Sequence, residues 1–128
     1  MNEPAECPFC SLPENRILFT TENALAFRDA FPISHGHTLV IPTRHVQSIF
    51  ELENAERSEL FEALSRARSD LISEIKPDGF NIGINDGLTA GQTVMHLHIH
   101  LIPRFAGDKA DPRGGIRWIF PEKAKYWP

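Results

Sequence analysis

The longest regular pattern of apolar and polar residues runs from Asn54 to Ile75. Apolar side chains recur there at intervals of three and four residues, at Leu60, Phe61, Leu64, Ala67, Leu71, Ile72 and Ile75. This spacing predicts an amphipathic helix of about six turns, because residues three and four apart share one face of a helix. We expect Pro77 and Gly79 to end it.

Shorter apolar segments bounded by turn residues lie on both sides of this helix. They predict strands at Arg16–Thr20, Ala24–Arg28, Thr38–Ile41 (stopped by Pro42), Phe80–Ile84 and Val94–Ile102 (closed by Pro103). From Arg104 to Pro128 we expect mostly irregular structure, with one short strand near Ile116–Phe120. Strands before and after one long helix, without βαβ alternation, predict an α+β fold. Its antiparallel sheet should have about five strands, beside one long helix and a short one.

Composition narrows the class of protein. The chain has 128 residues, 41% of them hydrophobic and 23% charged, which suits one packed domain. A net charge of −4 argues against a nucleic-acid-binding protein, which would usually be basic. No segment approaches the ~20 apolar residues of a membrane span. Met1–Glu6 has neither the positive charge nor the apolar run of a secretory signal, so we expect a cytoplasmic location.

Three histidines alternate with apolar residues in the last predicted strand. Side chains two residues apart point to one face of a strand, so His96, His98 and His100 form one row. The intervening Leu97, Ile99 and Leu101 form the row that packs on the core. A lone strand histidine is more often structural, but three in alternation favour chemistry. Two interpretations remain: a metal site, or a phosphate site with a histidine nucleophile.

Residues beside these histidines favour phosphate. The segment 91–93, Gly-Gln-Thr, supplies an amide and a hydroxyl that suit phosphate oxygens, and Asn85 and Arg104 lie at the ends of adjoining segments. Phosphoryl transfer is mainly positioning and charge stabilisation, so several donors around one nucleophile are what it needs. The other ring nitrogen of that nucleophile should donate to a fixed acceptor, for which we expect a backbone carbonyl.

Several separated blocks resemble the histidine triad hydrolases and transferases. They are His-Leu-His-Ile-His-Leu-Ile at 96–102, the preceding segment 85–94, the following Pro103-Arg104, and the upstream segment 29–42. The similarity runs from about Cys7 to Gly107, which implies a domain over residues 1–107 and a C-terminal tail over 108–128. The segment 101–108 is more similar to the dinucleoside polyphosphate hydrolase branch than to the phosphoramidase branch.

The resemblance implies a reaction and its catalytic residues. His98 would attack the α-phosphorus of a nucleotide and form a nucleotidyl-histidine intermediate that water then hydrolyses. His100 would hydrogen-bond the phosphate or the leaving group, and His37 would complete the phosphate surroundings. The substrate would be a dinucleoside polyphosphate or an adenosine phosphoramidate, and the product AMP. A family transferase, which passes the nucleotidyl group to phosphate, is a close variant.

The resemblance also implies substrate contacts. Gln92 and Thr93 would hold phosphate oxygens, and Asn85 would support their loop. Asp29 would accept hydrogen bonds from the ribose hydroxyls, and Phe27 and Ile17 would form the wall of a purine pocket. No organic cofactor is implied.

The two cysteines, Cys7 and Cys10, have C-x-x-C spacing. In a reducing compartment this spacing favours metal binding or redox chemistry over a structural disulfide, and a pair of free thiols is the plain alternative. Some bacterial relatives of the triad family bind zinc with such a pair, a later histidine and the first triad histidine. By this resemblance Cys7, Cys10, His45 and His96 would hold a structural zinc that orders the proline-rich leader.

The tail and the assembly complete the expectations. Lys and Arg side chains at 109, 113, 117, 123 and 125 make the tail locally basic. It is either a solvated tail or a source of Arg113 or Arg117 over the phosphates, and its tryptophans indicate that it packs on the domain or on a partner subunit. The family commonly forms two-fold dimers, which implies a homodimer. The rival functions are a metal-dependent hydrolase that uses all three alternating histidines as ligands, and a non-catalytic nucleotide-binding module.

Overall fold

A computed structural model of the chain describes residues 6–128. Its elements, in chain order, are β1 (Ile17–Thr20), β2 (Ala24–Arg28), β3 (Thr38–Pro42), α1 (Asn54–Ile75), β4 (Gly79–Ile84), β5 (Ile99–Arg104) and the short α2 (Pro121–Ala124), with 3-10 turns between several of them. The five strands form one antiparallel sheet in the order β1-β2-β3-β5-β4. This confirms the predicted α+β class, the five strands, and one long helix with a short one.

The long helix begins and ends where the sequence predicts. Glu53 and Glu56 form a reciprocal capping box that satisfies backbone N–H groups of the first turn. At the other end Lys76 takes a left-handed conformation, and Pro77 follows it. The buried face consists of Leu60, Ala63, Leu64, Ala67 and Leu71. Among residues 6–128, no helix combines the length and the apolar character that a membrane span needs.

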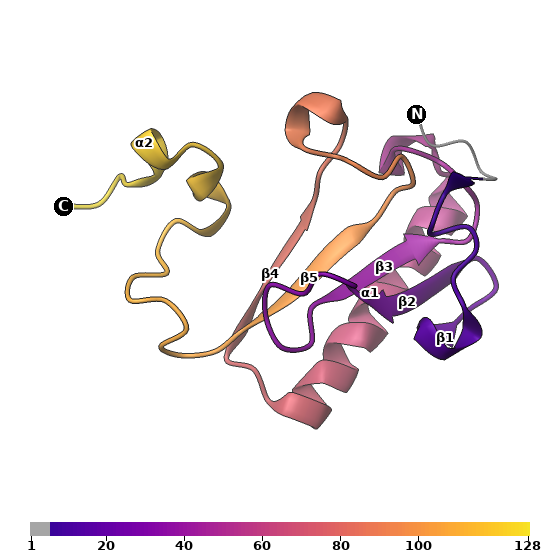
Figure 1. Ribbon diagram of the computed structural model, residues 1–128, viewed down its shortest axis with the longest axis horizontal. Helices are drawn as coiled ribbons and strands as arrows, with labels where there is room; N and C mark the ends of the chain where they lie inside the picture. Colours follow the sequence, from indigo (N-terminus) through magenta and orange to yellow (C-terminus); the bar gives the residue numbers. More distant parts are fainter. Residues whose placement is uncertain (1–5) are drawn as a thin grey trace.

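The helix covers one face of the sheet (Figure 1). Its apolar face packs against the inward row of β5 and its approach, Leu97, Ile99 and Leu101, as the alternation predicts. The other face of the sheet carries a smaller apolar cluster of Leu25, Phe27, Leu39 and Ile41. His96, His98 and His100 alternate with Leu97, Ile99 and Leu101, and therefore point away from α1, toward this second face.

The last strand is shorter at its start than predicted. Pairing with β3 begins at Ile99, opposite Val40, and residues 94–98 are not strand. Pro42, two residues beyond Val40, has no N–H to donate, so the ladder cannot continue there. Instead the Leu97 N–H donates to the carbonyl of Val46 at 2.7 Å. The strand also passes through Pro103 to Arg104.

The C-terminal residues lie beyond the β4 edge of the sheet (Figure 1), and a Cβ at Gly115 would come 3.2 Å from Nδ2 of Asn81 on β4. The predicted strand at Ile116–Phe120 is wrong: residues Gly115–Ile119 form a 3-10 helix. Gly114 and Gly115 both have positive φ, which turns the chain tightly, and Pro121 opens α2 directly afterwards. The tail packs mainly on itself, with Arg117 donating to the carbonyls of Lys123 and Ala124.

Candidate functional site

A broad cleft lies over the sheet face opposite α1. Most of the site residues predicted from sequence line it, namely Phe27, Asp29, His37, Asn85, Thr93, His98 and His100. They come from β2, the loop before β3, the loop after β4, the approach to β5, and β5 itself. The structure thus gathers in one cleft residues that are up to 73 positions apart in the sequence, from Phe27 to His100. Ile17 and Gln92 do not line it.

The ring of His98 is held in one tautomer by the backbone. Its Nδ1 lies 2.8 Å from the carbonyl oxygen of His96, and a carbonyl only accepts, so Nδ1 carries the proton. Nε2 is therefore unprotonated, with its lone pair available. The residue is buried but lines the cleft. This is the arrangement that a histidine nucleophile needs, with the fixed acceptor being the expected backbone carbonyl.

His100 and His37 form a second ordered pair beside it. The backbone N–H of Ile33 donates to Nδ1 of His37 at 3.2 Å, which leaves the proton of His37 on Nε2. That Nε2 lies 3.0 Å from Nδ1 of His100 and donates to it. Nδ1 of His100 is then an acceptor, so its proton is on Nε2. The backbone thus sets His100 as a donor, with its ring 5.2 Å from the ring of His98.

Burial keeps both members of this pair neutral. Burial and the neighbouring His98 and His37 lower the pKa of His100 to about 4. Burial also lowers the pKa of His37, against the opposing pull of the Asp29 carboxylate. Oδ2 of Asp29 lies 3.5 Å from Nε2 of His37, while its Oδ1 accepts from the N–H of Phe31. These three side chains are close enough to surround a cation. However, the N–H of Ile33 occupies Nδ1 of His37, so the Nε2 that faces the other two side chains carries the proton and has no lone pair for a cation.

One wall of the cleft is apolar. Phe27 is 1% exposed, and Phe9 packs edge-on against it with ring centroids 5.2 Å apart. Leu12 and Leu39 extend the same wall. Ile17, predicted to lie in this wall, packs against the cluster around Phe27. Sequence reasoning missed Phe9 and Leu12, although both are apolar residues in a leader that otherwise has few.

The loop between β4 and β5 is held together by Gln92. Its amide donates to the carbonyls of Gln47 and Val94, each at 3.1 Å, and its oxygen accepts from the N–H of Gly87 at 2.9 Å. The side chain is 1% exposed. Its polar atoms therefore bind backbone groups of the loop and do not face the cleft. The family resemblance implies a different role for Gln92, which is to hold phosphate oxygens. Thr93, its neighbour, is exposed and lines the cleft.

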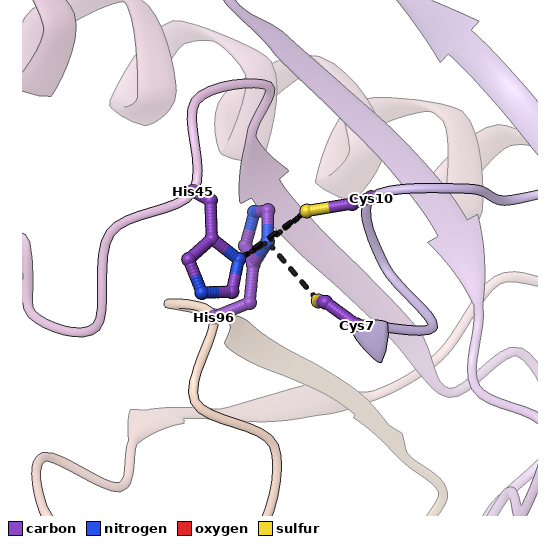
Figure 2. Close-up of side chains that lie close together, drawn as sticks. All are labelled: Cys7, Cys10, His45 and His96. Atoms are coloured by element: carbon purple, nitrogen blue, oxygen red, sulfur yellow. Dashed lines mark hydrogen bonds between the residues drawn. The ribbon is translucent and has the colours of Figure 1, made fainter. Parts of the chain in front are cut away.

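The four residues predicted as metal ligands lie together (Figure 2). We call Cys7, Cys10, His45 and His96 the Cys/His cluster. One ligand atom from each lies within 4.8 Å of all the others. Sγ of Cys10 is 3.2 Å from Nδ1 of His45, and Sγ of Cys7 is 3.5 Å from Nδ1 of His96.

The donor chemistry of the cluster fits zinc. Nε2 of His96 donates to the carbonyl of Pro42 at 2.8 Å, so its Nδ1 lone pair faces the cluster. Burial, the hydrogen bond with Cys7 and the charge of Cys7 raise the pKa of Cys10 to about 11. Two adjacent thiolates are therefore unfavourable unless a cation balances their charge. Two thiolates and two imidazoles are a tetrahedral Cys₂His₂ set.

His96 belongs to both parts of the site. Its side chain faces the Cys/His cluster, while its carbonyl accepts the proton of His98 Nδ1. The ring of His96 therefore belongs to the Cys/His cluster, whereas His98 and His100 line the cleft. Among residues 6–128, the three do not form a common group of possible metal ligands.

Comparison with known proteins finds similar chains. The HIT domain family model matches residues 13–107. The protein Hit of Bacillus subtilis is 34% identical over 86% of this chain and 77% of its own length. An asymmetrical bis(5'-nucleosyl)-tetraphosphatase of Schizosaccharomyces pombe is 36% identical over 82% of this chain and 58% of its own.

A solved structure is similar throughout the domain. A zinc-bound histidine triad family protein from Mycobacterium smegmatis is 33% identical to this chain, with a TM-score of 0.75. The similarity covers 85% of this chain and 82% of that one. Together with the family match over residues 13–107, these likenesses show that the chain belongs to the HIT domain family.

Proposed function

We propose that this protein hydrolyses a nucleotide at its α-phosphorus through a nucleotidyl-histidine intermediate on His98, releasing AMP. The observation that carries the proposal is the hydrogen bond from Nδ1 of His98 to the carbonyl of His96, which leaves Nε2 unprotonated in the cleft. The named activity of the Schizosaccharomyces relative supports a dinucleoside polyphosphate as substrate. An adenosine phosphoramidate is the second substrate class.

The chemical steps follow from the fixed tautomers. Nε2 of His98 attacks phosphorus, a P–N bond forms, and the bond from phosphorus to the leaving group breaks. Nε2–H of His100 donates to the phosphate or to the leaving atom, where charge develops. His37 holds His100 in that tautomer through its own Nε2–H. Water then attacks the same phosphorus and releases a proton to solvent, the P–N bond breaks, and AMP leaves as His98 recovers its lone pair.

The cleft residues supply the remaining contacts. We assign the purine to the apolar wall that includes Phe27, and the ribose hydroxyls to the carboxylate of Asp29. Thr93 and Asn85 face the phosphate region of the same cleft. Gln92 serves by bracing the loop that carries them, because its amide is bound to backbone groups.

We further propose that the Cys/His cluster binds a structural zinc ion. A closed set of four protein ligands leaves no position for substrate, so the ion supplies order and no reaction step. The zinc-bound Mycobacterium neighbour supports the choice of metal. A metal-dependent hydrolase on the three alternating histidines is less well supported, since the ring of His96 faces the cysteines and Nδ1 of His98 donates to a carbonyl.

For the assembly we propose a homodimer of domains 1–107, with the tail at 108–128 close to the partner. Strand β4 is one of the two edge strands, and among the described residues its far edge pairs with no other strand. Ile82 on this strand is 46% exposed. Ile116 and Ile119 of the tail are also exposed, at 68% and 67%. Light scattering on the purified protein should give twice the chain mass, and Ile82→Arg should give a monomer.

The proposed reaction is tested by product analysis. Diadenosine tetraphosphate and adenosine phosphoramidate are each incubated with wild type, with His98→Gln and with His37→Asn, and AMP is measured. We expect AMP from wild type, none from His98→Gln, and a reduced yield from His37→Asn, with circular dichroism used to check that both variants fold. Undiminished turnover by His98→Gln would refute the covalent route. AMP binding without turnover of either substrate would favour a nucleotide-binding module.

A further inference from the structure

Phe9 lies between the two cysteines of the Cys/His cluster and touches both parts of the site. Its ring packs edge-on against His98, with centroids 5.2 Å apart and an interplanar angle of 81°. The same ring contacts Phe27 of the cleft wall at 5.2 Å and His96 at 6.1 Å. One side chain of the leader thus contacts the proposed nucleophile, a cluster ligand and the base wall.

The position of this leader depends on the cluster. In the described part of the chain, all hydrogen bonds that join residues 7–13 to segments beyond residue 16 run through the thiols of Cys7 and Cys10. The remaining ones are local, such as the N–H of Cys10 to the carbonyl of Cys7 at 3.2 Å. Apolar contacts of Phe9 and Leu12 add to them. Without the cluster, the Phe9 ring keeps its ring and apolar contacts, but no hydrogen bond among the described residues ties its segment to the rest of the domain.

We infer that Phe9 is a positioning residue that couples metal binding at the Cys/His cluster to nucleotide binding in the cleft. With both thiols bound to one ion, the two-residue span between them is closed and the ring is fixed. Its edge then restrains the His98 ring and backs Phe27. With the ion removed, the ring gains freedom and the base wall loses its backing. This inference rests on the proposed function of the cleft.

The coupling is tested by a cycle of metal and side chain. AMP affinity is measured by calorimetry for wild type and Phe9→Leu, each loaded with Zn²⁺ and again after chelation. Phe61→Leu is the matched control, because Phe61 is 67% exposed on α1, which covers the other face of the sheet. Chelation should weaken AMP binding to wild type and to the control by about tenfold, the scale of lost aromatic contacts.

Phe9→Leu loaded with Zn²⁺ should bind the metal stoichiometrically. It should nevertheless bind AMP more weakly than loaded wild type, by nearly the same factor as chelation weakens wild type. Chelating this variant should add less than about threefold, because the path from cluster to cleft is already broken. If chelation weakened AMP binding by the same factor in wild type and in Phe9→Leu, the coupling would be overturned. A wild type that binds no Zn²⁺ would overturn it too. Loss of circular dichroism on chelation would also overturn it, in favour of a metal that only holds the fold.

A second readout needs no nucleotide. The ring protons of Phe27 are followed by NMR in the free protein, since Phe27 contacts Phe9 and is not a cluster ligand. They should shift on chelation of wild type and stay in place on chelation of Phe9→Leu. Absence of the wild-type shift would overturn the inference. The shift without any AMP binding would refute the proposed function and leave Phe9 as the link between cluster and cleft wall.

Discussion

Replacing Gly36 by alanine tests whether the loop that carries His37 depends on close packing against the helix. Gly36 has a φ of +86°, a conformation that residues with a Cβ rarely adopt. A Cβ there would lie 2.7 Å from Cδ1 of Ile75 and 2.9 Å from Cδ2 of Leu71. Pro103 of β5 is a third neighbour, at 3.3 Å. The substitution therefore forces either the loop or the side chains of Ile75 and Leu71 to shift, and Leu71 is fully buried.

The expected loss of stability has two parts. A left-handed conformation costs a residue with a Cβ about 1–2 kcal/mol. Overpacking against core side chains costs about 1–3 kcal/mol. The free energy of unfolding of Gly36→Ala should thus fall by about 2–5 kcal/mol. Because His37 is the next residue and its Nε2 holds His100, turnover should fall as well, by about tenfold to a hundredfold.

The assay is urea denaturation of Gly36→Ala beside Gly79→Ala, followed by AMP release from the folded variants. Gly79 is the matched control, because a Cβ there meets no atom within 4 Å and its φ is ordinary. Its free energy of unfolding should change by less than about 0.5 kcal/mol. Equal stability of the two variants would refute the packing argument. Full activity of Gly36→Ala would refute the role given to the His37 loop.

Three further predictions concern single side chains. The pKa of His100 is about 4 in the folded protein, against 6.5 for an unperturbed histidine. As the pH falls, the unfolded chain therefore takes up this proton before the folded one does. The free energy of unfolding should fall between about pH 6.5 and pH 4, by up to about 3 kcal/mol. Urea titrations should show a shallower acid loss for His100→Gln; an unchanged slope would contradict this. Gln92→Ala should lower the free energy of unfolding by about 2 kcal/mol or more, because buried backbone groups lose their partner. A thermal midpoint equal to wild type would show that the amide is not needed by the loop. Cys10→Ser should lose stoichiometric zinc by atomic absorption, whereas retained zinc would contradict the ligand set.

The elements that the sequence predicted well are those whose signal is local. The helix 54–75 has an apolar period, a capping box and a following proline, and its ends agree with the structure. The start of β5 was wrong because strand pairing depends on the neighbour. Pro42 on β3 is far away in sequence, and its missing N–H stops the ladder. The strand predicted at 116–120 was wrong because the two glycines before it bend the chain.

The candidate site was predicted to the extent that a motif names its residues. The alternation placed the rings of His98 and His100 on one face, and the family resemblance supplied His37 and the Cys/His cluster. Geometry outside any motif could not be predicted. The sequence has no signal that Ile33 donates to His37, or that the amide of Gln92 is used within its own loop. The contact of Phe9 with His98 also needs the folded leader.

The central claim is that His98 becomes covalently bound to the nucleotide. Wild type, His98→Gln and His100→Gln are mixed with diadenosine tetraphosphate, denatured at alkaline pH within the first turnover, and weighed intact by mass spectrometry. Alkali is used because a P–N bond to imidazole is labile in acid. The account predicts one added adenylyl group on wild type, located at His98 by fragmentation, and none on His98→Gln. AMP formation by wild type with no adduct at any time, and with His98→Gln equally active, would contradict it.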